Sequence, residues 1–79
     1  MAEHTVVLPQ FGMGMQDGEI LKWLKAVGDP IAEGEPLVEI EAAKTQVEVP
    51  SPVSGTLKRI VAEEGETVDV REPIAIIET

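Results

Sequence analysis

Lys44 is the side chain whose type and position in this sequence are best suited to chemistry. It is the only basic residue between Lys25 and Lys58, and its neighbourhood is otherwise acidic. An isolated primary amine held on a tight turn is a suitable point for attaching another group. Most surface lysines only keep a protein in solution, so this residue taken alone favours a solubilising role over a functional one.

The residues on either side of Lys44 alternate between apolar and polar, mostly acidic, side chains. In residues 37–41 and again in residues 46–49 the alternation has a period of two, which is typical of half-buried strands. The two runs meet at residues 42–44, so the sequence predicts a β-hairpin with Lys44 at its tip, projecting into solvent. Because the tip lacks the Asn-Gly or Asp-Gly that primed turns favour, we expect a type I turn, which accepts most residues.

Length and charge limit the partners that this chain can have. With 79 residues it is a single domain, which we assign to residues 1–79, and a core of this size removes about 60% of the unfolded surface from water. The formal net charge is −9, with only 6 basic residues. Nucleic acid and anionic membrane surfaces need a positive protein face, so this charge argues against both and favours partners with basic surfaces.

The residue types that enzymes use most are scarce. The chain has no cysteine, which excludes a thiol nucleophile, a thiolate metal site and a disulfide framework. His4 is the only histidine, and we expect it in a frayed terminus. The chain therefore lacks the residues for a histidine triad or a multi-histidine metal site. Carboxylate pairs such as Glu39 with Glu48 could bind a cation, but a solvated face is the better interpretation. We therefore predict neither an enzyme nor a metal site.

No segment directs the chain to a membrane or to export. The longest apolar run is far shorter than a membrane span, and the first residues lack the basic flank and apolar stretch of a signal peptide. We expect a location in the bacterial cytoplasm.

The chain is similar to itself at an offset of 37 residues, which predicts an internal duplication. The identical pairs are Gly18/Gly55, Gly28/Gly65, Glu35/Glu72, Pro36/Pro73, Ile40/Ile77 and Glu41/Glu78. Apolar positions match as well, and because aromatic residues are nearly absent the core must be aliphatic. The matched apolar pairs form the predicted core: Ile20/Leu57, Trp23/Ile60, Leu24/Val61, Ile31/Val68 and Leu37/Ile74.

A loop rich in glycine and methionine interrupts the first repeat. Residues 7–9 match residues 48–50 only if the first half carries 4 extra residues, and these fall within the loop. Its glycines allow backbone angles that other residues avoid, which predicts an exposed segment. Met13 and Met15 are adaptable apolar side chains, which suit either a contact surface or the edge of the core. We expect residues 12–17 to approach the lysine tip.

The fold that these repeats predict is all-β. Each half, approximately residues 5–41 and 46–78, supplies about four short strands, and no segment has the 3.6-residue apolar period that a helix requires. Two equivalent halves that each bury one face would pack as a flattened barrel or sandwich with internal pseudo-twofold symmetry. In that arrangement the lysine tip and the chain termini lie at opposite ends.

With its motifs in this order and spacing, the whole chain resembles a lipoyl domain of the biotinyl/lipoyl carrier family, of the type found in 2-oxo acid dehydrogenase acyltransferases. The resemblance is carried by Leu8-Pro9, Gly12-Met13-Gly14-Met15, Gly18-Glu19-Ile20, Val27-Gly28-Asp29-Pro30, Gly34, Glu41-Ala42-Ala43-Lys44-Thr45, Glu48-Val49-Pro50-Ser51-Pro52 and Gly55. It implies two four-stranded antiparallel sheets. It also implies that a lipoate ligase or a lipoyl transferase links lipoate to Lys44 through an amide.

The same resemblance implies a carrier rather than an enzyme. The domain would use lipoyl-Lys44 as a swinging arm between a thiamine-diphosphate-dependent decarboxylase, an acyltransferase catalytic domain that transfers the acyl group to coenzyme A, and dihydrolipoyl dehydrogenase. Gly34 and Gly55 would flank the attachment lysine and help to shape the hairpin. The implied recognition residues are Glu41, Ala43 and Thr45 at the hairpin and Gly12, Met13, Gly14 and Met15 in the loop.

The tip departs from the family pattern, and this leaves alternatives open. Lipoyl domains usually have Asp-Lys-Ala at this point and biotinyl domains Met-Lys-Met, whereas this sequence has Ala43-Lys44-Thr45. Glu41-Ala42 leans toward biotin carriers, while the long loop and the Trp23 segment look lipoyl. The alternatives are a biotin carrier domain of a carboxylase, with biotin on Lys44, and an unmodified structural β-domain.

Overall fold

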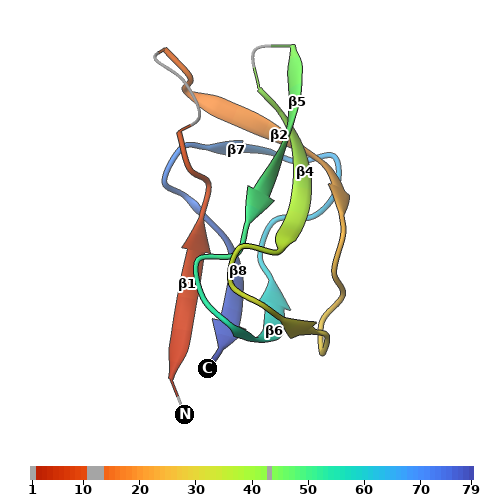
Figure 1. Ribbon diagram of the computed structural model, residues 1–79. Helices are drawn as coiled ribbons and strands as arrows, with labels where there is room; N and C mark the ends of the chain where they lie inside the picture. The colour runs from red at the N-terminus through yellow and green to blue at the C-terminus, as the bar shows by residue number, and fades with distance from the viewer. Residues whose placement is uncertain (1, 11–13, 43) are drawn as a thin grey trace.

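In the part of the chain that the structure describes, eight β-strands make up the fold (Figure 1). The structure, a computed structural model, describes residues 2–10, 14–42 and 44–79, and none of these residues is helical. This part of the chain therefore contains no helix that could cross a bilayer. The strands are β1 (Glu3–Val7), β2 (Asp17–Trp23), β3 (Pro30–Ile31), β4 (Pro36–Ala42), β5 (Thr45–Pro50), β6 (Gly55–Ile60), β7 (Thr67–Asp69) and β8 (Pro73–Glu78).

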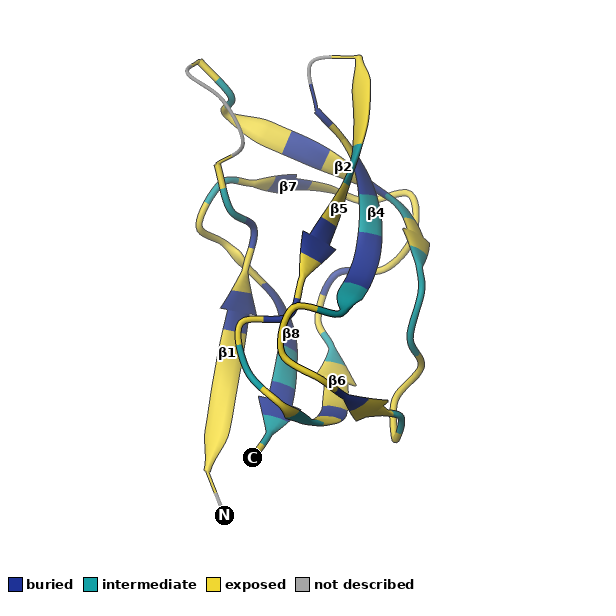
Figure 2. Ribbon diagram, in the orientation of Figure 1, coloured by how far each residue is buried: buried dark blue, intermediate teal, exposed yellow. Residues whose placement is uncertain are grey.

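The strands form two antiparallel sheets that pack as a flattened sandwich, which confirms the predicted fold class. One 4-stranded sheet has the order β1-β8-β6-β3 and the other has the order β5-β4-β2-β7. Buried and exposed positions alternate along much of each strand, so that each sheet turns its apolar side inward (Figure 2). The buried cluster is aliphatic and consists of Val6, Leu8, Ile20, Ile31, Leu37, Val38, Ile40, Val49, Leu57, Ala62, Val68, Ile74, Ala75 and Ile77.

The two sheets correspond strand by strand, with β1, β2, β3 and β4 equivalent to β5, β6, β7 and β8. Under that exchange the order β1-β8-β6-β3 becomes β5-β4-β2-β7. The registers correspond as well, since Ile20 lies opposite Ile40 as Leu57 lies opposite Ile77, and a register shift follows at the equivalent place in each sheet. This correspondence supports our proposal that residues 5–41 and 46–78 are duplicated halves of one domain.

The register of β1 corrects the predicted size of the loop insertion. The pairing of β1 with β8 and of β5 with β4 makes Val6 the counterpart of Val49, 43 residues later. The other strands correspond at an offset of 37 residues, so the first half carries 6 extra residues between β1 and β2, not four. The sequence comparison had matched residues 7–9 with residues 48–50 by residue type, whereas cross-strand pairing decides the true alignment.

Most of the predicted core is buried. The buried pairs are Ile20 and Leu57, Ile31 and Val68, and Leu37 and Ile74. Trp23 and Ile60 are half-buried and pack against the core, and the indole N–H of Trp23 donates to the carbonyl of Ala62 at 2.8 Å. The prediction is wrong for Val61, which is 40% exposed, and Leu24 is only half-buried. These two residues follow the ends of β6 and β2, where the chain leaves the sheets.

The amino-terminal segment lies in a strand, which contradicts the expectation of a frayed terminus. His4 lies in β1 opposite Ile77 of β8. Beside this pair, the backbones of Ala2 and Thr79 exchange two hydrogen bonds, with N···O distances of 3.2 and 2.8 Å. The two chain ends therefore lie together, and Figure 1 shows them at the opposite end of the molecule from the β4–β5 hairpin, as the repeat predicts.

Gly55 allows β6 to approach β8 closely. A Cβ at this position would overlap the backbone carbonyl oxygen of Glu78 and lie 2.9 Å from Cγ2 of Ile77. Gly55 therefore serves the sheet of β1 and β8, and its implied role in shaping the lysine hairpin is wrong. Gly34 does lie near that hairpin, because its N–H donates to the carbonyl of Ser51 at 2.8 Å where β4 begins and β5 has ended.

Replacing Gly55 by alanine should strongly destabilise the fold. We expect Gly55→Ala to lower the free energy of unfolding by about 3 kcal/mol, because a backbone carbonyl cannot move aside as a side chain can. The twofold counterpart Gly18→Ala is the matched control, since the nearest atom to a new Cβ there is the flexible Cδ1 of Ile40 at 3.3 Å. Urea denaturation measures both variants, and equal losses would contradict this interpretation.

Candidate functional site

The hairpin of β4 and β5 presents Lys44 on a two-residue turn. Ala42 pairs with Thr45, so only residues 43 and 44 connect the strands. Lys44 has a φ of 66°, in the left-handed region. A type I turn has negative φ at both central positions, so the type I prediction is wrong. Two-residue hairpins favour positive φ because it matches the twist of the strands, and here that geometry outweighs a cost of about 1 kcal/mol for a lysine.

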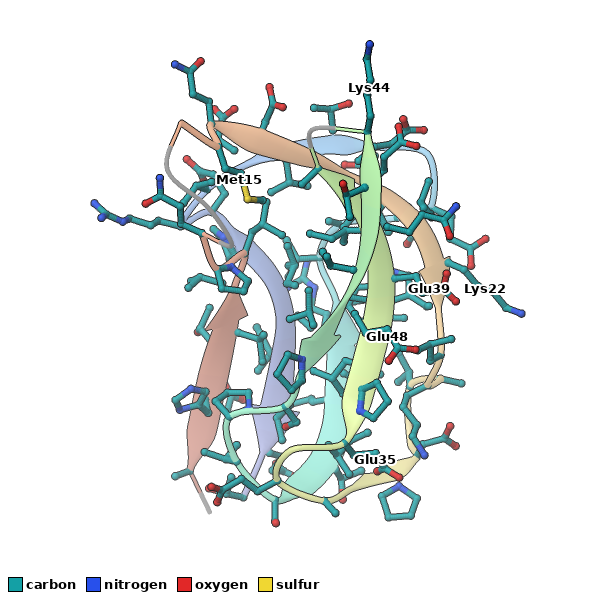
Figure 3. All side chains as sticks on the ribbon, turned by 45° about the horizontal axis from the view of Figure 1, so that its top comes forward. Met15, Lys22, Glu35, Glu39, Lys44 and Glu48 are labelled. Atoms are coloured by element: carbon teal, nitrogen blue, oxygen red, sulfur yellow. The ribbon has the colours of Figure 1, made fainter. Side chains whose placement is uncertain are left out.

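The Lys44 side chain is exposed and points away from the body of the domain (Figure 3). Within the described ranges it takes part in no ion pair, whereas Lys25 lies 3.1 Å from Glu35 and Lys58 is paired with Glu3. The hydrogen bond with Glu3, together with the charge of that carboxylate, raises the pKa of the Lys58 amine. Among the described residues, Lys44 is thus an amine without an ion-pair partner, which fits the point of attachment predicted from the sequence.

The predicted recognition residues fall on the hairpin and on the loop. Glu41 and Thr45 are exposed, one on each strand that flanks the tip. Gly14 is exposed with a φ of 86°, while Met15 is half-buried and packs against the core. Met15 therefore covers the edge of the core, which is one of the two roles expected for it. Three of the predicted residues lie outside the described part of the chain: Gly12, Met13 and Ala43.

Residues 14–16, which end the loop between β1 and β2, lie at the same end of the domain as the hairpin tip (Figure 1). They lead into β2, where Glu19 lies opposite Glu41 of β4. Gly18 is close to the same strand, since a Cβ there would lie 3.5 Å from the Glu41 carbonyl oxygen. The side-chain amide of Gln10 donates to the Met15 carbonyl at 3.3 Å and so spans the loop. The fold therefore places residues 14–16 and the lysine at one end.

A turn between β7 and β8 fixes the base of this loop, and sequence reasoning missed it. Leu8, before the loop, exchanges backbone hydrogen bonds of 2.8 and 3.0 Å with residues 71–72. Gln16, after the loop, accepts a hydrogen bond of 3.0 Å from the N–H of Val70. The turn thus holds both ends of the loop. The signal for it lay in the repeat, because the equivalent turn at residues 33–35 contains a glycine.

The outer face of the β5-β4-β2-β7 sheet is acidic. Carboxylates lie directly opposite one another in three cross-strand pairs: Glu39/Glu48, Glu19/Glu41 and Asp17/Asp69. Like charges in such positions destabilise a sheet. The described residues contain no group of three or more His, Asp or Glu side chains arranged to hold a metal ion. The three pairs therefore place six carboxylates on the outer face of this sheet.

Comparison with known proteins places the chain among attachment domains. A protein-family model described as "Biotin-requiring enzyme" matches residues 4–77. The dihydrolipoyllysine-residue acetyltransferase component of the pyruvate dehydrogenase complex of Corynebacterium glutamicum is 47% identical over 76 residues, which cover 96% of this chain and 11% of that protein. The lipoamide acyltransferase component of the branched-chain alpha-keto acid dehydrogenase complex of Bacillus subtilis is 42% identical over 79 residues, covering 100% of this chain and 19% of that protein. The chain thus spans less than a fifth of the length of these relatives.

Two solved structures resemble the domain. The lipoyl domain of the 2-oxoglutarate dehydrogenase complex of Azotobacter vinelandii has a TM-score of 0.76 and 29% identity, and the match covers 95% of each chain. The urea carboxylase of Kluyveromyces lactis has a TM-score of 0.84 and 26% identity, with 99% of this chain matched to 6% of that chain. The sandwich therefore has one counterpart of its own size and one within a much larger protein.

The amine of Lys44 should react faster than the ion-paired amines of Lys25 and Lys58. At limiting acetic anhydride we expect Lys44 to be acetylated before Lys58, because the hydrogen bond with Glu3 occupies the Lys58 amine and raises its pKa, which lowers the fraction in the neutral, reactive form. Lys25, held by Glu35, should also react later than Lys44. Peptide mass mapping over time gives the order of reaction. If Lys44 were acetylated at the same rate as Lys58 and Lys25, or more slowly, the result would contradict its exposed position at the tip.

Replacing one carboxylate of an acidic cross-strand pair by a lysine should stabilise the fold. Glu48→Lys should raise the free energy of unfolding by about 0.5 kcal/mol, because it turns repulsion from Glu39 into attraction. The control Glu48→Gln removes only the repulsion and should give a smaller gain. Thermal unfolding at low ionic strength measures both, and the gain should shrink at about 1 M salt. A lower melting temperature for Glu48→Lys would refute the pairing.

Proposed function

The chain belongs to the biotin/lipoyl attachment family, and from this premise we propose that Lys44 carries lipoate in an amide bond. In this proposal the domain is not itself an enzyme. It is a swinging-arm carrier that moves acyl groups and reducing equivalents between the active sites of a 2-oxo acid dehydrogenase complex.

The observation that carries the proposal is the display of Lys44. An amide forms between a carboxyl group and an amine, so attachment needs an amine that a modifying enzyme can enclose. Lys44 meets this need, because it is exposed on a two-residue turn at the end of the domain opposite the termini (Figures 1 and 3). The residues present therefore fit the group.

Similarity to known proteins favours lipoate over biotin. The Corynebacterium glutamicum relative is named for a dihydrolipoyllysine residue and the Bacillus subtilis relative for lipoamide. The solved domain that matches this chain along 95% of both lengths is a lipoyl domain. We carry these properties over to this chain as part of the proposal.

The chain's own contribution is presentation and docking. Bound lipoate would supply a disulfide that accepts an acyl group as it is reduced. The fold holds the attachment amine at the apex of a sandwich whose long dimension is 36 Å, remote from the chain ends. A tether joined at those ends leaves the lysine end free to enter successive active sites and raises its local concentration there. The acidic outer sheet would steer it toward basic partner surfaces.

The partners follow from this role. A lipoate ligase or lipoyl transferase would modify Lys44. A thiamine-diphosphate-dependent decarboxylase, an acyltransferase catalytic domain and dihydrolipoyl dehydrogenase would then act on the modified arm in turn. We place the domain in the bacterial cytoplasm, on the ground that the relatives named above are components of bacterial dehydrogenase complexes.

Biotin carriage is the second candidate. The family model is described as "Biotin-requiring enzyme", and the urea carboxylase structure has the higher TM-score of the two structures compared, 0.84 against 0.76. In a biotin carrier the same amine would hold the group and the same hairpin would present it. The two candidates therefore differ in the modifying enzyme and not in the site.

Intact mass measures which group the chain accepts. After incubation with ATP and either a bacterial lipoate ligase with lipoate or a biotin ligase with biotin, we expect one lipoyl increment and no biotinyl increment. Lys44→Arg, which keeps the charge and removes the primary amine, should abolish the increment.

Lys22→Arg is the matched control, because Lys22 is also exposed but lies within β2. This variant should be modified as fully as the wild type. A biotinyl increment alone would favour the second candidate. A lipoyl increment that persists in Lys44→Arg would place the attachment on another lysine, and no increment with either ligase would leave an unmodified structural domain.

A further inference from the structure

Arg71 shares an uncommon backbone conformation with the attachment lysine. Among the described residues other than glycine, only Lys44 and Arg71 have a positive φ, at 66° and 76°. This region is disfavoured for any residue with a Cβ. Residues held there tend to gather at functional sites, so an outlier of this kind invites a hypothesis about function.

The other half of the domain shows that the turn does not need the Arg71 side chain. Its twofold counterpart Gly34 has a φ of 88° and donates its N–H to the carbonyl of Ser51 at 2.8 Å, just as Arg71 donates to the carbonyl of Leu8 at 2.8 Å. A glycine thus makes the same turn and the same hydrogen bond without strain. The backbone geometry of the turn therefore does not account for an arginine at this position.

The guanidinium is free to meet a partner. Arg71 is exposed, and over the ranges that the structure describes the ion pairs are those of Lys25 and Lys58. The formal charge of −9 already keeps the chain far from neutrality, so one cation does not serve solubility. Neither an internal contact nor the net charge accounts for this residue.

Arg71 lies in the turn that holds the base of the loop between β1 and β2. Residues 14–16 of that loop stand at the lysine end (Figure 1). A specific interface covers roughly 800 Å² on each partner. The two shorter dimensions of the domain are only 20 and 18 Å, so a contact of that size extends from the tip down the sides of the sandwich. A contact that extends down the side bearing the loop would include the turn at residues 70–72, which holds the base of that loop.

We propose that Arg71 is a recognition residue that pairs with a carboxylate on the decarboxylase that acylates the arm of Lys44. The proposal rests on the carrier function proposed above. A guanidinium pairs with a carboxylate through two parallel hydrogen bonds, which fixes orientation as well as adding attraction. The decarboxylase transfers its acyl group to the carrier domains that it binds, so its recognition of a domain decides which acyl group enters the complex. Arg71 is positive, whereas the outer face of the β5-β4-β2-β7 sheet is negative. A complementary partner surface must therefore carry a carboxylate for Arg71 and basic residues for the sheet, and this combination of charges gives specificity.

The test compares four lipoylated chains: wild type, Arg71→Gly, Arg71→Lys and Arg59→Gln. Each is offered to the decarboxylase components for pyruvate, branched-chain 2-oxo acids and 2-oxoglutarate, and the component that acylates the wild type fastest is used throughout. Arg59 is exposed on β6 in the other sheet, so its variant loses the same charge away from the loop. Melting temperature, and chemical-shift titration of the unmodified chains with the same component, give readouts that are independent of turnover.

We expect Arg71→Gly to melt no lower than the wild type, because glycine suits the positive φ, and to lose about fivefold in kcat/KM through a higher KM. The chemical-shift titration of Arg71→Gly should show correspondingly weaker binding. The kcat/KM of Arg71→Lys should lie between those of Arg71→Gly and the wild type, and the kcat/KM of Arg59→Gln should equal that of the wild type. The loss should fade at about 0.5 M salt.

Three results would overturn the proposal. If Arg71→Gly is acylated and bound like the wild type, Arg71 has no recognition role while the carrier function stands. If Arg59→Gln loses as much as Arg71→Gly, the effect is one of net charge alone. If no decarboxylase acylates the wild type, the carrier function and the role of Arg71 fall together.

Discussion

Every feature of the site depends on the register in which β4 pairs with β5. With Ala42 opposite Thr45, only two residues remain for the turn, and the second of them is Lys44. A slip of one residue would turn each side chain of β5 to the other face, exposing Val49 and burying Glu48. The aliphatic core resists this slip, because Val49 is 1% exposed and belongs to the buried cluster. Core packing thus determines where the amine stands.

The internal symmetry separates what the fold needs from what the function needs. Both sheets use the same strand order and the same register shifts, so the shared features are structural. The halves differ at most positions in sequence, and three of the differences bear on the site: the lysine turn, the loop after β1 and the residue at position 71. The lysine turn has the chain ends as its counterpart, since Ala2 and Thr79 pair as Ala42 and Thr45 do. The lysine turn and residues 14–16 of the loop lie at one end of the domain, and the turn at position 71 holds the base of that loop.

Much of this could be predicted from the sequence, and the failures have physical causes. Periodicity identified the hairpin with Lys44 at its exposed tip, because alternation reports directly which face is buried. The scarcity of aromatic residues and the internal repeat identified the aliphatic core. Periodicity could not give the turn type, since the twist of paired strands imposes positive φ on a residue that does not favour it. The insertion was undercounted because residue similarity misaligned β1. Arg71 was overlooked because the backbone hydrogen bonds between its turn and Leu8 do not depend on residue type, and the repeat marked the turn only through Gly34 in the other half.

The most direct test of the central claim is the backbone geometry of the hairpin tip in solution, measured by nuclear Overhauser effects on the isotopically labelled chain. The account predicts a cross-strand contact between the amide protons of Ala42 and Thr45, together with the intense contact between the amide and α protons of Lys44 that marks a positive φ. A contact from Ala42 to Gln46 instead, or a weak amide-to-α contact within Lys44, would show a different register or turn and would contradict the display of the amine on which the proposed function depends.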